Sequence, residues 1–192
     1  RNIEIFIEAT GNPIVGTVHA AKILKEKKHL ILVNVEADIT CGKYLSDLAK
    51  ENGADAAKFQ HFSANTIVSK KTFDEMQSKL SHQKTWKKSV YEVYKEASLN
   101  LNWTKKLKKE CDKIGIDFFT SPYSISLIKY VNKFVCAYKI GSGDITWIDA
   151  IKEMAQKNKP IIIATGASTI LDVNRAVKEI KKHNNKICIM QC

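Results

Sequence analysis

Charged and polar residues stand where several short apolar segments of this 192-residue chain end. They are Glu36, Lys58 and Gln60, Thr120 to Tyr123, Lys139 to Asp144, Thr165 to Ser168, and Gln191. Lysine supplies positive charge, while serine and glycine let hydroxyls and backbone N–H groups approach a ligand, a combination typical of phosphate and carboxylate sites. Lys58 and Lys139 lie within apolar segments that we expect to be buried, so each lysine needs a partner. The sequence therefore predicts an anion site at these segment ends.

No pattern of metal ligands accompanies these residues. The five histidines, at positions 19, 29, 61, 82 and 183, lack metal-ligand spacing, and Cys188 and Cys192 have no matching His or Cys pair. We therefore predict no metal site and interpret these cysteines as buried thiols. The segment GNPIVGT at residues 11–17 lacks the Lys-Ser/Thr ending of a phosphate loop, and we interpret it as the start of a helix.

The charge of the chain favours small anionic ligands over nucleic acid. The sequence has 31 Lys and Arg against 20 Asp and Glu, a formal net charge of +11. Only Arg1 and Arg175 are arginines, whereas nucleic-acid readers favour the bidentate guanidinium, so we expect no nucleic-acid partner. We interpret most of the lysines as solvated charges on helix faces, and a basic surface of this kind can also attract anionic substrates. Apolar runs such as residues 161–164 are too short to span a bilayer, and five cysteines without paired spacing are typical of a reduced, cytoplasmic protein.

Short apolar runs alternate with amphipathic stretches, which predicts alternating strands and helices. We expect strands at residues 3–8, 29–36, 54–60, 116–120, 135–140, 160–164 and 187–191. We expect helices at residues 13–27, 43–52, 86–97, 103–114, 124–132, 147–157 and 169–183, and a polar loop over residues 61–85. Continuous apolar strands indicate a parallel sheet buried on both faces. A doubly wound sheet and a (β/α)8 barrel both fit, and both place a site at the carboxyl ends of the strands.

From about Gly53 to Cys192 the chain resembles the N-acetylneuraminate (sialic acid) synthase family. The matching segments, in order, are GADAAKFQHF, LNLNWTKKLKKECDKIGIDFFTSPYS, AYKIGSGDITW, KPIIIATGAST and ICIMQC. The family fold is a (β/α)8 barrel, usually followed by a small antifreeze-like domain. The resemblance therefore implies an α/β protein of the TIM-barrel type. It also implies a transferase of sialic acid biosynthesis that condenses phosphoenolpyruvate with an N-acetylated amino sugar and releases phosphate.

The resemblance also assigns roles to individual residues. It implies that phosphoenolpyruvate and the amino sugar are bound by Lys58, Gln60, Ser121, Lys139 and Ser142. It implies catalytic roles for Glu36, which ends an expected strand as the family's glutamate does, and for Asp144, near the reacting centre. Lysines and hydroxyls suit a trianionic substrate. A divalent metal, Mn or Mg, is implied with ligands that we expect outside this chain, as is a homodimer.

The first 42 residues resemble a different family. The segment IEATGNPIVGTVHAAKILKEKKHLILVNVEAD is similar to part of an NAD(P)-dependent, homoserine-dehydrogenase-like oxidoreductase that carries an antifreeze-like domain, without its glycine fingerprint. Where the synthase family has EIGxNHxG, this chain reads NVEADITCG, and the distance from there to KFQ is several residues shorter. We therefore predict a fusion: a Rossmann-like βαβ remnant at residues 1–42, and a partial synthase barrel, lacking its last two strands, at residues 43–192.

Three hypotheses on function follow from these patterns. The chain is a synthase, a non-catalytic relic that keeps only an anion pocket, or a fragment of an NAD(P)-dependent oxidoreductase. The relic would retain Lys58, Ser121, Lys139 and Ser142. Condensation activity would separate the first two hypotheses, and tight NADH binding would favour the third.

Overall fold

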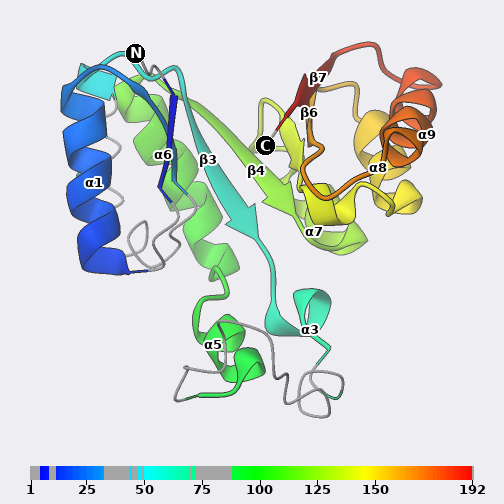
Figure 1. Cartoon of the computed structure of the whole chain (residues 1–192), viewed down its shortest axis with the longest axis horizontal. Helices are drawn as coiled ribbons and strands as arrows, with labels where there is room; N and C mark the ends of the chain where they lie inside the picture. Colours follow the sequence, from blue (N-terminus) through cyan, green and yellow to red (C-terminus); the bar gives the residue numbers. More distant parts are fainter. Residues whose placement is uncertain are drawn as a thin grey trace. The chain divides into compact units, whose positions relative to one another are not determined.

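The computed structural model describes residues 5–8, 12–32, 44, 47–48, 50–69, 71 and 88–191. The chain divides into two compact units, one of residues 1–57 with 109–117, the other of residues 58–108 with 118–192. Both units combine strands and helices (Figure 1), which makes the chain an α/β protein. Within the described part, no helix has the length and apolar character needed to cross a membrane.

The first unit contains a βαβ element, as predicted for the N-terminal segment. It consists of β1 (Ile5–Glu8), α1 (Pro13–Lys25) and β2 (His29–Leu32). The two strands pair in parallel, with Phe6 opposite Leu30. A parallel pair needs a crossover connection, which α1 supplies.

Residues at both ends of α1 explain why this segment is helical. Asn12 is the N-cap, as predicted: its side-chain oxygen accepts hydrogen bonds from the backbone N–H groups of Ile14 and Val15. Pro13 follows at the first helical position, where its fixed φ suits a helix and its missing N–H costs nothing. One side of α1 then packs through Ala20 and Leu24.

The second sheet has five parallel strands in the order β3-β4-β5-β6-β7. They are β3 (Ala56–His61), β4 (Asp117–Pro122), β5 (Tyr138–Ile140), β6 (Ile161–Ala164) and β7 (Ile187–Met190). In the centre, Tyr138 lies opposite Thr120 on one side and Ile161 on the other. Each strand therefore pairs with the next along the chain. A doubly wound sheet reverses its strand order at a switch point, so this order favours winding of the barrel type.

Helices follow the strands in the same order. They are α3 (Ala64–Ile67), α5 (Val90–Glu96), α6 (Thr104–Ile114), α7 (Ile125–Val131), α8 (Ile148–Ala155) and α9 (Ile170–Lys181). Two 3-10 turns, η2 (Leu101–Trp103) and η3 (Ser142–Asp144), complete the described helical segments. α7 packs against α8, and α8 against α9. Ile128, Ile151 and Ile180, one from each of these helices, are fully buried together with Ile161 and Ile163 of β6.

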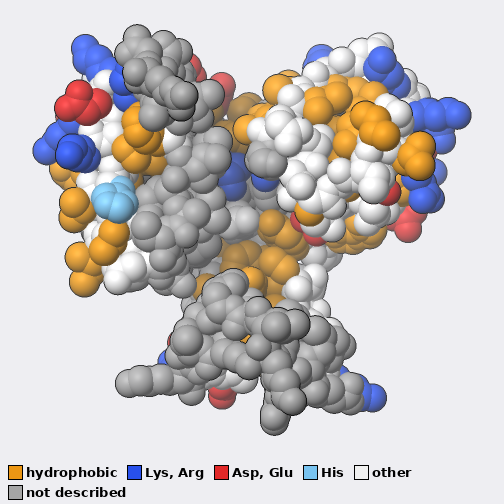
Figure 2. Space-filling view, viewed as in Figure 1, with side chains coloured by type: hydrophobic (Ala, Val, Ile, Leu, Met, Phe, Trp, Pro, Cys, Tyr) orange, Lys and Arg blue, Asp and Glu red, His pale blue; other side chains and the backbone are white. Residues whose placement is uncertain are grey.

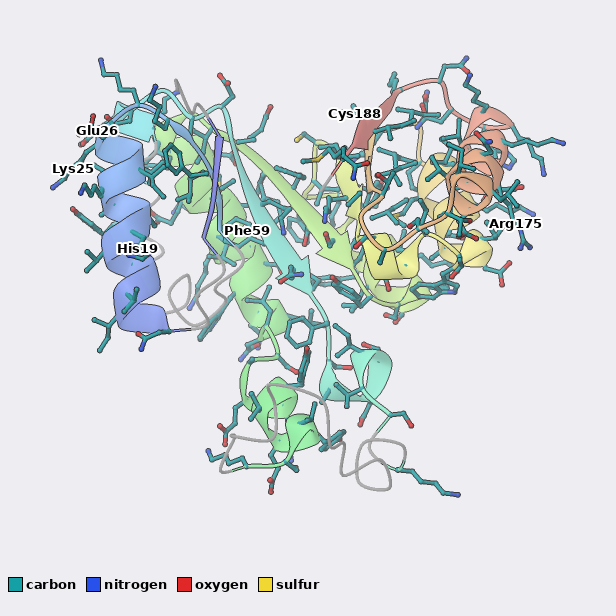
Figure 3. The ribbon with its side chains drawn as sticks, viewed as in Figure 1. His19, Lys25, Glu26, Phe59, Arg175 and Cys188 are labelled. Carbon is teal, nitrogen blue, oxygen red and sulfur yellow. The ribbon has the colours of Figure 1, made fainter. Side chains whose placement is uncertain are left out.

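The outer side of α9 is exposed and carries basic residues. Figure 2 shows Lys and Arg side chains over the outer side of α9, where Arg175 lies (Figure 3). The exposed lysines of α9 are Lys178 and Lys181. These charges are therefore on solvated helix faces, as the amphipathic pattern predicts.

Two expectations from the sequence were wrong in detail. The region 61–85, predicted as a loop, contains the short helix α3, and the rest of it beyond Ser69 lies largely outside the described residues. α6 begins at Thr104, one residue later than predicted, because Asn100 accepts a hydrogen bond from the backbone N–H of Asn102 and starts the turn η2. Trp103, expected to be the first residue of the helix, lies in η2 and is 45% exposed.

Candidate functional site

A small pocket lies at the carboxyl ends of β4 and β5. Its lining residues are Ser121, Pro122, Tyr123, Lys139, Ile140, Gly141, Asp144, Trp147, Ala150, Ile151 and Met154. Its cavity volume is about 10 Å³, which is room for about one water molecule. The floor is apolar, from α8, while the lysine, the carboxylate and the hydroxyls come from the strand ends. Of the seven predicted site residues, Ser121, Lys139 and Asp144 meet here.

Lys139 and Asp144 give the pocket one charge of each sign. Lys139 is the central residue of β5, and Asp144 ends the turn η3 that follows it. Burial raises the pKa of the Asp144 carboxyl, and the positive charge of Lys139 opposes that rise. A side chain at position 141 would place its Cβ 2.8 Å from Oδ2 of Asp144, so glycine there lets the carboxylate fold over the backbone.

Ser121 contributes a buried hydroxyl to the same pocket. The residue is 3% exposed, and its Oγ makes no hydrogen bond with any described residue. A buried polar atom without a partner costs free energy, so this hydroxyl would gain from a ligand oxygen. Ser121 is therefore a candidate ligand contact on structural grounds that are independent of the sequence motif.

Gln60 and Lys58 approach the site from β3. Nε2 of Gln60 donates a hydrogen bond of 3.1 Å to the hydroxyl of Tyr123, a pocket residue. Lys58 is two positions earlier on the strand and partly buried, so it projects to the same face of the sheet as Gln60. Lys58 does not line the pocket at β4 and β5.

The remaining predicted residues lie elsewhere or outside the described part. Ser142 is partly buried in η3, and its backbone oxygen accepts a 3.2 Å hydrogen bond from Oγ of Ser168. This bond ties the loop after β6 to the loop after β5. Glu36 lies outside the described residues, so its catalytic role stays a prediction.

Sequence reasoning missed the roles of Tyr123 and His61. His61 ends β3 and is fully buried, with Nδ1 2.8 Å from Oγ1 of Thr120 and Nε2 2.9 Å from Oγ1 of Thr104. Burial lowers the pKa of His61 to about 4. Its neighbour Phe59, labelled on β3 in Figure 3, stacks on Phe118 at 4.9 Å between ring centroids. A histidine at the end of a predicted strand was the available signal, but its partners are remote in sequence.

The described residues do not by themselves form a metal site. Among them, no group of three or more His, Cys, Asp and Glu residues could hold a metal ion. At the pocket, Asp144 is the one carboxylate, and it is paired with the charge of Lys139. A single carboxylate beside a cation does not suit Mn²⁺ or Mg²⁺, which prefer several oxygen ligands.

The fold and the pocket define an α/β protein of the barrel type, with lysine, carboxylate and hydroxyl groups at the carboxyl ends of its strands. The chain belongs to the NeuB family, whose pattern matches residues 45–192. That match includes every described residue of the pocket.

Curated relatives and solved structures agree with this membership. The chain is 31% identical over 164 residues to pseudaminic acid synthase of Helicobacter pylori, covering 83% of this chain and 47% of that protein. It is 30% identical over 177 residues to N,N'-diacetyllegionaminic acid synthase of Campylobacter jejuni, covering 86% and 52%. The crystal structure of an N-acetylneuraminic acid synthetase from Leptospira borgpetersenii, 21% identical, matches with a TM-score of 0.64 over 81% of this chain and 49% of that one.

The extent of these matches bears on the whole-chain predictions. The chain spans about half the length of these curated relatives. The family match begins at residue 45, and none of the relatives named here is an oxidoreductase. The predicted resemblance of residues 1–42 to an oxidoreductase therefore receives no support from these comparisons, although the predicted βαβ element is present.

Proposed function

We propose that this chain acts in nonulosonic acid biosynthesis, condensing phosphoenolpyruvate with an N-acetylated amino sugar. The names of its relatives, which are synthases of such acids, support the proposal. The observation that carries it is the meeting of Lys139 with the unpartnered hydroxyl of Ser121 in one pocket at the strand ends. That combination suits an anionic group, and phosphoenolpyruvate carries two such groups, its phosphate and its carboxylate.

The chemistry assigns a role to each residue. Lys58 and Lys139 attract the phosphate and carboxylate of phosphoenolpyruvate, and the hydroxyls of Ser121 and Ser142 donate hydrogen bonds to their oxygens. The C3 carbon then forms a bond to the aldehyde carbon of the sugar. A water oxygen adds at C2, and inorganic phosphate leaves. Asp144 supplies the proton that the aldehyde oxygen needs to become a hydroxyl, because its raised pKa favours the protonated form.

A second candidate is anion binding without condensation. The observation that favours it is the lining of the pocket, which includes Lys139 and Ser121 but neither Lys58 nor Gln60. Lys139 and Ser121 suffice for a small anion. In this case phosphoenolpyruvate binds, but the amino sugar is not consumed.

The experiment is calorimetric titration of the full 192-residue chain with phosphoenolpyruvate, with and without Mn²⁺. Lys139→Ala should weaken binding at least about tenfold, because a charge-assisted contact is lost. Lys178→Ala is the matched control, because Lys178 is an exposed lysine of α9 that does not line the pocket. This variant should bind as the wild type does. A folded chain that shows no saturable binding would refute the proposal.

Phosphate release in the presence of N-acetylmannosamine then separates the two candidates. Turnover supports the synthase, and binding without turnover supports the anion-binding alternative.

Location in the cytoplasm and assembly as a homodimer belong to the same proposal. Size-exclusion chromatography with light scattering tests the homodimer.

A further inference from the structure

The position of Tyr123 is fixed by contacts of both its backbone and its ring. It directly follows β4, and its backbone N–H donates to the carbonyl oxygen of His61 at 2.9 Å. Its ring meets that of Phe62 edge-on, with centroids 6.2 Å apart and planes at 89°. Backbone and ring contacts together therefore fix the position of its hydroxyl.

That hydroxyl contacts Gln60 and lies within the electrostatic influence of Asp144. It accepts the hydrogen bond from Nε2 of Gln60. It also lies 3.8 Å from the point where a Cβ on Gly141 would stand, and Oδ2 of Asp144 lies 2.8 Å from the same point. Burial first, and then the negative charge of Asp144, raise the pKa of the Tyr123 phenol, so the hydroxyl is neutral at every physiological pH.

The hydrogen bond decides which end of the Gln60 amide a ligand meets. An amide has a donor end and an acceptor end of nearly equal shape, so its rotation exchanges one for the other. With Nε2 engaged by the Tyr123 hydroxyl, the carbonyl oxygen Oε1 has a set orientation. An acceptor there suits the hydroxyl and N–H groups of an amino sugar and does not suit the oxygens of a phosphate.

We infer that Tyr123 is a positioning residue that orients Gln60 for selection of the N-acetylated amino sugar, an inference that rests on the proposed function. Without the phenol oxygen, the amide is free to rotate and to present its N–H groups to the acetamido N–H of the sugar, which is itself only a donor. The residues proposed to bind phosphoenolpyruvate, among them Lys139 and Ser121, do not depend on this hydrogen bond. Loss of the hydroxyl should therefore act on the sugar and leave phosphoenolpyruvate binding unchanged.

The test removes one oxygen atom with Tyr123→Phe, which keeps the ring contact with Phe62. Tyr130→Phe is the matched control, because that hydroxyl also makes one hydrogen bond, to the carbonyl oxygen of Leu101, on α7 and outside the pocket. N-acetylmannosamine is titrated into each full chain saturated with phosphoenolpyruvate. In parallel, heteronuclear NOE measurements on the ¹⁵N-labelled side-chain amide of Gln60 report its mobility.

The expected result for Tyr123→Phe is a sugar dissociation constant raised about three- to tenfold, with phosphoenolpyruvate affinity as in the wild type. The Gln60 amide should also become mobile, and Tyr130→Phe should change neither property. Unchanged sugar affinity or an unchanged Gln60 amide in Tyr123→Phe overturns the inference, as does a wild-type chain that binds phosphoenolpyruvate but no sugar. A wild-type chain that binds neither ligand overturns the proposed function itself.

Discussion

At the scale of single residues, the hydrogen bonds of Thr120 determine the proton position on His61. Oγ1 of Thr120 donates its one hydrogen to the carbonyl oxygen of Phe59 at 2.8 Å. It must therefore accept from Nδ1 of His61, so Nδ1 carries the ring proton. Nε2 is then the acceptor for the hydroxyl of Thr104. A neutral imidazole with its proton on Nδ1 satisfies all three groups, in agreement with its lowered pKa.

This arrangement predicts a loss of stability in acid. The folded-state pKa of His61 is about 4, below the ordinary value of 6.5, so below pH 6.5 the unfolded chain binds a proton that the folded chain does not. The contribution of neutral His61 to the free energy of unfolding is therefore fully present above pH 6.5. It decreases as the pH falls toward 4, by about 3 kcal/mol in all. Urea unfolding of wild type and His61→Gln between pH 7.5 and 4.5 measures it.

The glutamine variant provides the comparison because its side chain does not titrate. Its unfolding free energy should be lower than that of the wild type at pH 7.5, and the difference should shrink as the solution is acidified. Parallel pH profiles for the two proteins would contradict the neutral, Nδ1-protonated histidine. Direct ¹⁵N NMR of the imidazole ring would show the same tautomer independently.

At the scale of elements, the cap of α7 links the site strand to its helix. Ser124 follows Tyr123 by one residue, and its Oγ accepts a 3.1 Å hydrogen bond from the backbone N–H of Leu127. Ser124→Ala should lower the free energy of unfolding by about 1 kcal/mol, the usual value of an N-cap. Ser126→Ala is the control, since it removes only a hydroxyl 2.9 Å from that of Ser124. Urea unfolding measures both variants. If the free energy of unfolding fell equally in the two, the hydrogen bond from Ser124 to the backbone would not explain the loss of stability.

The sequence predicted the elements of the second unit better than it predicted their polar contacts. The apolar runs that became β5 and β6 are short, so few alternatives compete with a buried parallel strand. β7 formed where it was predicted, but it is not buried: Ile189 is 53% exposed, and Cys188, interpreted from the sequence as a buried thiol, is exposed. α3 was missed because its four residues, ANTI, stand in a polar stretch without helical periodicity. Lys139, Ser121 and Asp144 could be predicted because strand ends meet at one edge of a parallel sheet.

The partners of Gln60 and His61 could not be predicted in that way. Gln60 and Tyr123 are 63 positions apart, and His61 and Thr120 are 59 positions apart. Such contacts depend on the register between β3 and β4, which no local pattern specifies. Tyr123 therefore has no signature in the sequence beyond its position after a strand.

At the scale of the whole molecule, the charge of +11 and the pocket make separable contributions to anion binding. If the chain binds phosphoenolpyruvate as proposed, its surface charge attracts the ligand over a distance of about 10 Å at 0.1 M salt, and added salt screens this attraction. The ligand's contacts with Lys139 and Ser121 would be short and shielded from solvent, so salt should affect them less. Raising NaCl from 0.05 to 0.5 M should therefore slow association about tenfold in stopped-flow measurements, while dissociation changes little.

The variants separate the two contributions further. Lys139→Ala should mainly accelerate dissociation, because it removes a contact inside the pocket and only one unit of the net charge. A double replacement of the exposed Lys178 and Lys181 by Ala should instead slow association and leave dissociation as in the wild type. If Lys139→Ala changed only the association rate, the bound anion would be held by the general field of the surface. The pocket at β4 and β5 would then not be its binding site.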